Sequence, residues 1–283
     1  MEPGFALADI DTSRPHPARM YDYFLGGKDN YAVDQEAARE ILQAVPEVRA
    51  MALENRAFLQ RAVRFLVGEA GIRQIIDIGT GIPAAGNVHE IAQDTAPDVR
   101  VIYVDNDPIV HVHASALLTG TGSTRIVLAD LREPEAILAH PKVRELIDFS
   151  QPVALLLIAI LHFITDDENP GEIIATFRDA LLPGSYLALS HGTADFHSED
   201  TVSHGTRVYQ RATAPLVLRS HAQATALFDG FDLVEPGLVQ VPLWRPAARR
   251  PRLPGLAGIG IYGGVGHLRH ASGSEVADLS QSL

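Results

Sequence analysis

The feature that most constrains the fold is a regular alternation of short apolar runs and helical stretches that begins after Gly71. Short apolar runs bounded by glycine, proline or polar residues are typical of buried strands, and the segments between them have helical spacing. The predicted strands lie at 74–79, 101–105, 125–130, 152–161, 185–190, 231–235 and 258–262. This alternation predicts a doubly wound, mostly parallel α/β sheet with helices on both of its faces.

Helical patterns also precede the first strand, which predicts an N-terminal helical extension. Apolar residues recur at helical spacing over 33–45 and again over 55–67, and Pro46 marks the end of the first pattern. We therefore divide the chain into an N-terminal segment with its helices at 1–70, a core α/β domain at 71–270 and a loosely ordered tail at 271–283.

Composition excludes several classes of function. The chain has no cysteine, which rules out disulfides, thiolate metal ligands and a cysteine nucleophile, and we expect no metal site. A net charge of −12 disfavours a nucleic-acid partner. The longest apolar stretch is far shorter than the ~20 residues that span a bilayer, and the N-terminus does not resemble a signal peptide. We expect a cytoplasmic protein with no membrane partner.

Three of the predicted strands end in an aspartate. Asp77 precedes the turn Gly79-Thr80-Gly81, and Asp105 and Asp130 close the next two strands. Ligands of parallel sheets bind beyond the carboxyl ends of the strands, so these side chains are expected to meet at one edge. Glycine lets the backbone approach a ligand closely. Asp105 could accept hydrogen bonds from ribose hydroxyls, Asp130 could bind an adenine amine, and Asp77 could hold an ammonium group.

The glycine turn by itself does not identify the ligand. Gly79-x-Gly81-x-x-Ala84 also fits the dinucleotide pattern, so a nicotinamide-dependent oxidoreductase is the alternative function. Pro83 lacks an N–H that a pyrophosphate would need, and a dinucleotide offers no ammonium group to Asp77. S-adenosylmethionine carries one ribose, one adenine, one carboxylate and one ammonium group. We favour S-adenosylmethionine as the cofactor.

Longer motifs carry a resemblance to a known family. The runs Asp77-Ile-Gly-Thr-Gly81 and Tyr103-Val-Asp-Asn-Asp-Pro108 resemble those of a class I S-adenosylmethionine-dependent methyltransferase. An actinobacterial family called S-adenosyl methyltransferase, formerly a domain of unknown function, has similar runs at 14–31, 55–63, 86–90, 129–134, 183–191 and 262–266. The resemblance implies a seven-stranded, Rossmann-like sheet and S-adenosylmethionine as the cofactor of the 71–270 domain. It implies no substrate.

The segment from Tyr21 to Tyr31 combines aromatic rings, a glycine pair and charged residues. One interpretation is a helix end with Gly26 and Gly27 as its C-cap, and the other is that 1–70 forms a lid over the cofactor. Lys28 could pair with the cofactor carboxylate, or equally with a neighbouring aspartate. The predicted cofactor-binding residues are Tyr23, Lys28, Asn30, Asp77, Gly79, Thr80, Gly81, Asn87, Asp105, Asn106, Asp130, Leu131 and Ala159.

Two histidines are the candidates for catalysis. His162 follows the fourth strand and His191 ends the fifth, and imidazole suits a general base near neutral pH, although His162 could equally anchor its loop. We expect His204 and Tyr209, from an insertion at 192–215, in the substrate wall.

Methyl transfer from a sulfonium is an in-line displacement, so a base is needed only if the acceptor must lose a proton early. We predict a methyltransferase that acts on a small molecule. A protein that binds the cofactor without turnover, and one that methylates a protein, stay open as alternatives, and the sequence does not indicate the oligomeric state.

Overall fold

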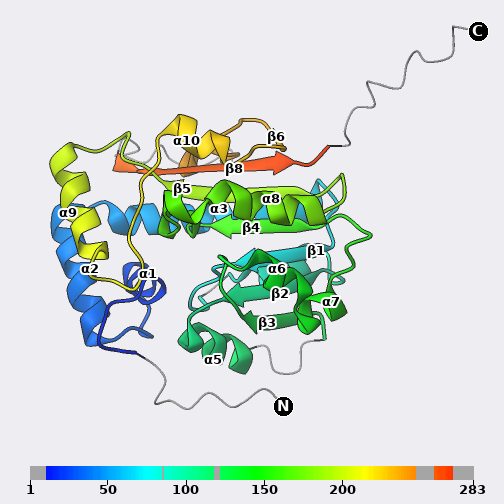
Figure 1. Ribbon diagram of the computed structural model, residues 1–283, viewed down its shortest axis with the longest axis horizontal. Helices are drawn as coiled ribbons and strands as arrows, with labels where there is room; N and C mark the ends of the chain where they lie inside the picture. The colour runs from blue at the N-terminus through cyan, green and yellow to red at the C-terminus, as the bar shows by residue number, and fades with distance from the viewer. Residues whose placement is uncertain (1–10, 85, 118–121, 247–257, 270–283) are drawn as a thin grey trace, which may run out of the picture.

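A mixed sheet forms the centre of the computed structural model, which describes residues 11–84, 86–117, 122–246 and 258–269. Its strand order is β3-β2-β1-β4-β5-β8-β6, and β7 pairs with β8 (Figure 1). The strands β1 to β5 are parallel, whereas β8 is antiparallel to β5, β6 and β7. The bounds are β1 (Gln74–Ile78), β2 (Arg100–Asp105), β3 (Thr124–Leu128), β4 (Ala154–Ile158), β5 (Tyr186–Gly192), β6 (Asp232–Leu233), β7 (Val239–Gln240) and β8 (Ile261–His267).

This topology confirms the predicted doubly wound, mostly parallel α/β fold, with local differences. A two-residue strand, β7, joins the seven predicted strands, and the last strand covers Ile261–His267 instead of 258–262. The fourth strand ends at Ile158 rather than at 161, because Ala159 has a φ of +56° and turns the chain out of the sheet. The predicted tail at 271–283 lies outside the described residues.

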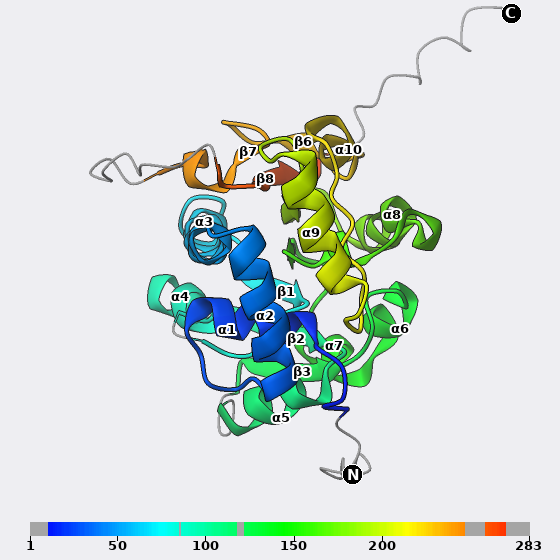
Figure 2. The same cartoon turned by 90° about the vertical axis from the view of Figure 1, so that its left-hand side faces the viewer.

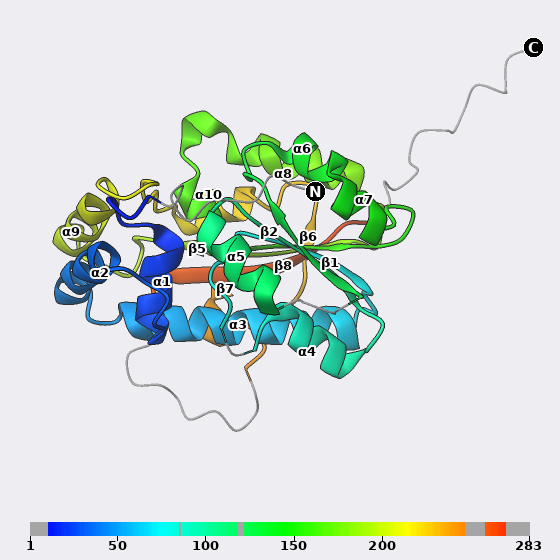
Figure 3. The same cartoon turned by 90° about the horizontal axis from the view of Figure 1, so that it is seen from below.

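Helices cover both faces of the sheet, as Figure 3 shows from below. On one face, α3 and α4 pack over Ile75 and Val101, and on the other, α6, α7 and α8 pack over Ile76 and Ile102. None of the helices in the described ranges is both long and apolar enough to span a membrane. The helix bounds are α1 (Pro17–Leu25), α2 (Ala32–Ala44), α3 (Val48–Gly68), α4 (Val88–Thr95), α5 (Pro108–Leu117), α6 (Pro134–Ala139), α7 (Pro141–Leu146), α8 (Pro170–Ala180), α9 (Glu199–Tyr209) and α10 (His221–Ala226).

The helices α1, α2 and α9 lie across the carboxyl ends of the parallel strands (Figure 2). They form an apolar cluster apart from those on the two faces of the sheet, and in it Met20 and Phe24 of α1 pack with Ile41 of α2 and Val208 of α9. We call these three helices the cover. Residues separated by almost the whole length of the core domain therefore close the same edge of the sheet.

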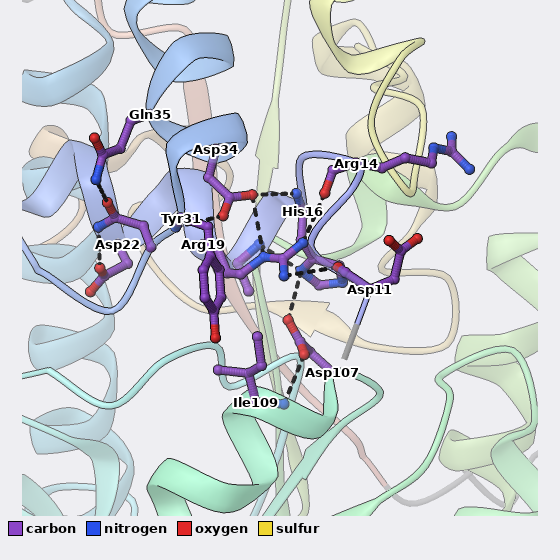
Figure 4. Close-up of polar contacts among 12 residues, drawn as sticks. Asp11, Arg14, His16, Arg19, Asp22, Tyr31, Asp34, Gln35, Asp107 and Ile109 are labelled. Atoms are coloured by element: carbon purple, nitrogen blue, oxygen red, sulfur yellow. Dashed lines mark hydrogen bonds and ion pairs between the residues drawn. The ribbon is translucent and has the colours of Figure 1, made fainter. Parts of the chain in front are cut away.

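A buried polar network fixes the first part of the cover (Figure 4). Asp34 of α2 lies 3.2 Å from the guanidinium of Arg19 and accepts hydrogen bonds from the backbone N–H groups of His16 and Tyr31. The imidazole of His16 in turn lies 3.1 Å from the carboxylate of Asp107, at the N-terminus of α5. The side chains of Arg19 and Asp34 are almost completely buried, so each charge depends on the other for compensation.

We predict that Asp34→Ala lowers the free energy of unfolding by about 3–5 kcal/mol, because it leaves the Arg19 charge buried without its partner. Urea unfolding followed by circular dichroism measures this change. Glu40→Ala, which removes an exposed ion pair of the same helix with Arg211, is the control and should cost about 0–1 kcal/mol. Equal losses in the two variants would contradict the role given to the buried pair.

Candidate cofactor-binding site

The turn after β1 has the backbone geometry that its glycines predict. Gly79 and Gly81 have φ values of +72° and +68°, in the left-handed region that favours glycine. A Cβ at Gly79 would lie 2.6 Å from the side chain of Ile160, so another residue there would have to displace the loop after β4. The Gly81 N–H donates to the carboxylate of Asp105 at 2.8 Å. This bond fastens the turn to the end of β2.

The parallel strands bring most of the predicted site residues to one cavity of about 300 Å³. Asp77 and Asp105 come from neighbouring strands, and Asp130 follows β3. The predicted residues that line this cavity are Asp77, Gly79, Thr80, Gly81, Asp105, Asn106, Asp130, Leu131, Ala159 and His162. The expected convergence at the carboxyl edge of the sheet is therefore present.

The three carboxylates have different environments. Burial raises the pKa of Asp77 to about 7, against the opposing effect of the Arg56 guanidinium. Burial also raises the pKa of Asp105 to about 6, although the backbone N–H groups of Asp107 and Gly81 donate to it. The upward effect of burial on Asp130 is outweighed by hydrogen bonds, chiefly from Arg132, and its pKa is lowered. Two buried acids thus favour a cationic partner at this edge.

Arg56 is a cavity residue that the sequence analysis missed. It comes from α3, lines the cavity, donates to the carbonyl of Gly86 at 3.1 Å and favours the charged form of Asp77. Arg56 lies off the apolar face of the predicted helix at 55–67, and this position predicts a solvent-exposed side chain. The packing of α3 against α4, and the hydrogen bond of Arg56 to Gly86 in the loop between β1 and α4, place this side chain at the cavity.

A chain of hydrogen bonds holds the end of β4 in place. The hydroxyl of Ser190 accepts the Ala159 N–H at 2.9 Å and donates to the side chain of Asn55, which donates to the hydroxyl of Tyr21. A left-handed backbone at a residue other than glycine costs on the order of 1–3 kcal/mol. The chain from α1 and α3 therefore stabilises a strained residue, Ala159, that lines the cavity.

Four predicted cofactor ligands lie outside the cavity lining. The ring of Tyr23 lies 5.5 Å from the Arg49 guanidinium, and Lys28 is exposed. Asn30 donates to the carboxylate of Asp22, and Asn87 is the N-cap of α4. The geometry gives no support to a direct contact of Tyr23, Lys28, Asn30 or Asn87 with a cofactor, and that role stays a prediction.

The glycine pair after α1 behaves as the helix-end interpretation predicts. Gly26 has a φ of +83° and is the C-cap, with its N–H donating to the Tyr23 carbonyl. The lid interpretation also has a counterpart, since α1 contributes Tyr21, Asp22 and Phe24 to the cavity lining. The two interpretations of this segment are compatible, because the capped helix is itself part of the cover.

His162 lines the cavity, whereas His191 does not. The Nδ1 of His162 accepts the N–H of Gly192 at 3.1 Å. Both ring nitrogens of His191 are engaged, Nδ1 with the Gly192 carbonyl at 2.7 Å and Nε2 with the buried guanidinium of Arg219 at 2.8 Å. Burial lowers the pKa of His191 to about 4 and that of His162 well below its ordinary value. A role for His191 as general base finds no support in this geometry.

The insertion at 192–215 contributes to the cavity lining, and of the two residues predicted for a substrate wall only Tyr209 takes part. Tyr209 lines the cavity with Thr201 and Thr206 of α9. His204, on the same helix, is exposed and its ring contacts the carbonyl of Asp200. His197 is a further lining residue that the sequence analysis did not single out.

Comparisons with known proteins identify the family. The chain matches the S-adenosyl methyltransferase family over residues 4–269. It is similar to the crystal structure of a candidate methyltransferase from Thermobifida fusca YX, with 40% identity, a TM-score of 0.86 and coverage of 92% of this chain and 97% of that chain. A DUF574 family protein from Streptomyces avermitilis MA-4680 has 44% identity, a TM-score of 0.86 and coverage of 91% and 98%.

A more distant neighbour supports the fold alone. It belongs to the Haloferax volcanii complex between the Trm112 methyltransferase activator and a candidate methyltransferase, with 19% identity, a TM-score of 0.51 and coverage of 84% of this chain and 96% of that chain. No curated protein matches this chain. The match over residues 4–269 and the two similar structures show that the chain belongs to the S-adenosyl methyltransferase family. It is an S-adenosylmethionine-dependent methyltransferase of class I fold.

The residues of the cavity fit S-adenosylmethionine. A Cβ at Gly81 would meet no heavy atom within 4 Å, so the turn leaves open space beside its backbone where a nucleoside can approach closely. Asp77 is buried beside one arginine, and the ammonium group of the cofactor would compensate it. The turn, the acids and Arg56 thus match the ribose, ammonium and carboxylate groups of one molecule.

We predict that Asp77 makes the protein less stable as the pH rises. Its folded-state pKa is raised from 3.8 to about 7, so the folded state holds this proton more tightly than the unfolded state, and stability falls as pH rises between these values. Across that interval, the free energy of unfolding of Asp77→Asn should rise relative to that of the wild type by up to about 1.4 kcal/mol per pH unit. Urea unfolding at a series of pH values measures the difference. Asp98→Asn, at an exposed position, is the control, and parallel curves for Asp77→Asn and wild type would contradict the prediction.

Proposed function

We propose that the protein transfers a methyl group by in-line displacement to a small molecule held in the same cavity as the cofactor. The observation that supports this is the continuity of the cavity, which runs from the acidic edge at Asp77 and Asp105 to residues of α9 and α1. A cofactor and an acceptor that share one cavity can be held in line at reacting distance, which is the main requirement of this reaction.

We assign the cofactor groups by charge and position. Asp105 would accept the ribose hydroxyls, Asp77 would hold the ammonium group and Arg56 would pair with the carboxylate. Asn106, Asp130 and Leu131 would border the adenine. When bound, S-adenosylmethionine supplies an electrophilic methyl group on its sulfonium, so the chain needs no covalent catalyst.

The protein's own contribution is orientation and exclusion of water. The N-terminal segment at 1–70 would act as a lid through α1 and α2, and α9 would complete the closure over the acceptor. His162 is the histidine that we place against the acceptor, and we give His191 a positioning role through Arg219. Enclosure under apolar side chains strengthens the electrostatic interactions inside the cavity.

We predict that a labelled methyl group appears in small molecules. The protein is incubated with methyl-labelled S-adenosylmethionine and a bacterial lysate that ultrafiltration has divided into small-molecule and macromolecular fractions. Label should pass to the small-molecule fraction with stoichiometric S-adenosylhomocysteine, and heat-denatured protein is the control. Label confined to the macromolecular fraction would overturn the proposed acceptor class, and the absence of S-adenosylhomocysteine from both fractions would favour a protein that binds without turnover.

We predict that Asp105→Ala weakens S-adenosylmethionine binding by ~1–3 kcal/mol, because the ribose hydroxyls lose their acceptor in a desolvated site. Isothermal titration calorimetry measures the affinity, and circular dichroism shows whether the turn after β1 still folds. Asp229→Ala, whose side chain is 95% exposed, should leave the affinity unchanged. An unaltered affinity in Asp105→Ala would place the ribose elsewhere.

A further inference from the structure

The cavity has a charged end and an uncharged end. Asp77, Asp105, Asp130, Arg56 and Arg132 line it at the edge of β1, β2 and β3. Asp22 of α1 also lines it, and its carboxylate accepts hydrogen bonds from the Asp29 N–H and the Asn30 side chain. By contrast, the described lining residues that come from 193–218 include no aspartate, glutamate, lysine or arginine; they are Thr193, His197, Thr201, Val202, Gly205, Thr206, Tyr209, Thr213, Ala214, Leu216 and Leu218. Because a buried charge without a partner is costly, the end beneath α9 favours an uncharged ligand.

His162 lines the cavity between these two ends, and its hydrogen bonds fix its tautomer. The Gly192 N–H donates to Nδ1 at 3.1 Å, so Nδ1 must hold a lone pair and cannot carry a hydrogen. A neutral imidazole has one N–H, which is therefore on Nε2. Among the described residues, Nε2 has no hydrogen-bond partner and is not enclosed by protein atoms. The ring thus presents a donor to the cavity.

Neither His191 nor His197 can present the same N–H donor to the cavity. In His191 the Arg219 guanidinium, which has no acceptor atom, donates to Nε2, and Nδ1 donates to the Gly192 carbonyl. In His197 the Nε2 is buried, and a Cβ at Gly260 would lie 2.5 Å from it. Phe163 packs on the His162 ring at a centroid distance of 4.4 Å and holds it in its orientation.

We propose that His162 donates a hydrogen bond from Nε2 to an oxygen of the methyl acceptor, and that this acceptor is an uncharged, mainly apolar molecule. The inference rests on the proposed function and deepens it by naming the class of substrate. A ring whose Nδ1 lone pair is occupied and whose Nε2 carries the hydrogen cannot take a proton from the acceptor. His162 therefore recognises the substrate and is not the general base that its position after the fourth strand suggested.

The tautomer is tested without any substrate. Long-range ¹H–¹⁵N correlation spectra of the full chain with S-adenosylhomocysteine distinguish a protonated ring nitrogen from an unprotonated one, and His162→Gln identifies the signals by their loss. We expect a protonated Nε2 and an unprotonated Nδ1. Their ¹⁵N chemical shifts should stay constant between pH 6 and pH 8, the range in which an ordinary histidine titrates. A hydrogen on Nδ1, or an imidazolium, would overturn the proposal.

The substrate class is tested with a pair of probes, acetophenone and ethylbenzene, in which a carbonyl group of the first replaces a methylene group of the second. His162→Gln retains a donor at about the reach of Nε2, whereas His162→Asn retains the acceptor for the Gly192 N–H but not that reach. In the S-adenosylhomocysteine complex, wild type and His162→Gln should bind acetophenone about 3–10-fold more tightly than ethylbenzene. In His162→Asn the ratio should fall to about one. Ligand-observed NMR titration measures both affinities.

Two results would overturn the proposal: the same ratio in all three proteins, or no binding of either probe to the wild type. Calorimetry with S-adenosylhomocysteine keeps this failure distinct from failure of the proposed function. All three proteins should bind S-adenosylhomocysteine alike, because His162 is placed on the acceptor and not on the cofactor. If the wild type fails to bind S-adenosylhomocysteine, the proposed function fails whatever the probes show.

Discussion

Asp77 and Asp105 lie on adjacent parallel strands with exposed fractions of 5% and 6%. Their desolvation is the constraint on which the rest of the site depends. Burial raises the pKa of each, and a neighbouring carboxylate adds to the rise, that of Asp105 for Asp77 and that of Asp107 for Asp105. The sheet edge is therefore less stable near neutral pH until a cation compensates it. Arg56 supplies part of that compensation, and a cofactor with an ammonium group would supply the rest. The free energy of cofactor binding and the free energy of unfolding therefore depend on the same two side chains.

The cover explains how a nucleoside-binding edge becomes a chamber with two chemically different ends. The helices α1 and α2 precede the sheet and α9 follows β5, yet they share one apolar cluster. The buried pair of Arg19 and Asp34 fixes the first two helices (Figure 4). Tyr21 is connected to the end of β4 by hydrogen bonds through Asn55 and Ser190. The described lining residues from 193–218 carry no charged side chain other than histidine, so the proposed acceptor region beneath α9 would discriminate by shape and hydrogen bonding.

The neighbouring imidazoles of His162 and His191 show why a residue type at a strand end does not define its chemistry. His162 follows β4 and His191 lies at the end of β5, and the two look equivalent in the sequence. Arg219, which lies far along the chain, occupies Nε2 of His191, while the Gly192 N–H fixes the hydrogen of His162 on its cavity-facing nitrogen. A backbone amide and a buried guanidinium decide which ring can meet a ligand. No local pattern around either histidine contains that information.

The sequence by itself determined the doubly wound fold, the glycine turn and the meeting of Asp77, Asp105 and Asp130, because strand periodicity and parallel topology place strand ends at one edge. The family motifs pointed to S-adenosylmethionine through their resemblance to a known family. Only the tertiary structure decided that Arg56 points inward and that Lys28 stays outside. Burial and hydrogen-bond partners arise from contacts between segments far apart in the chain, and a linear pattern does not specify them.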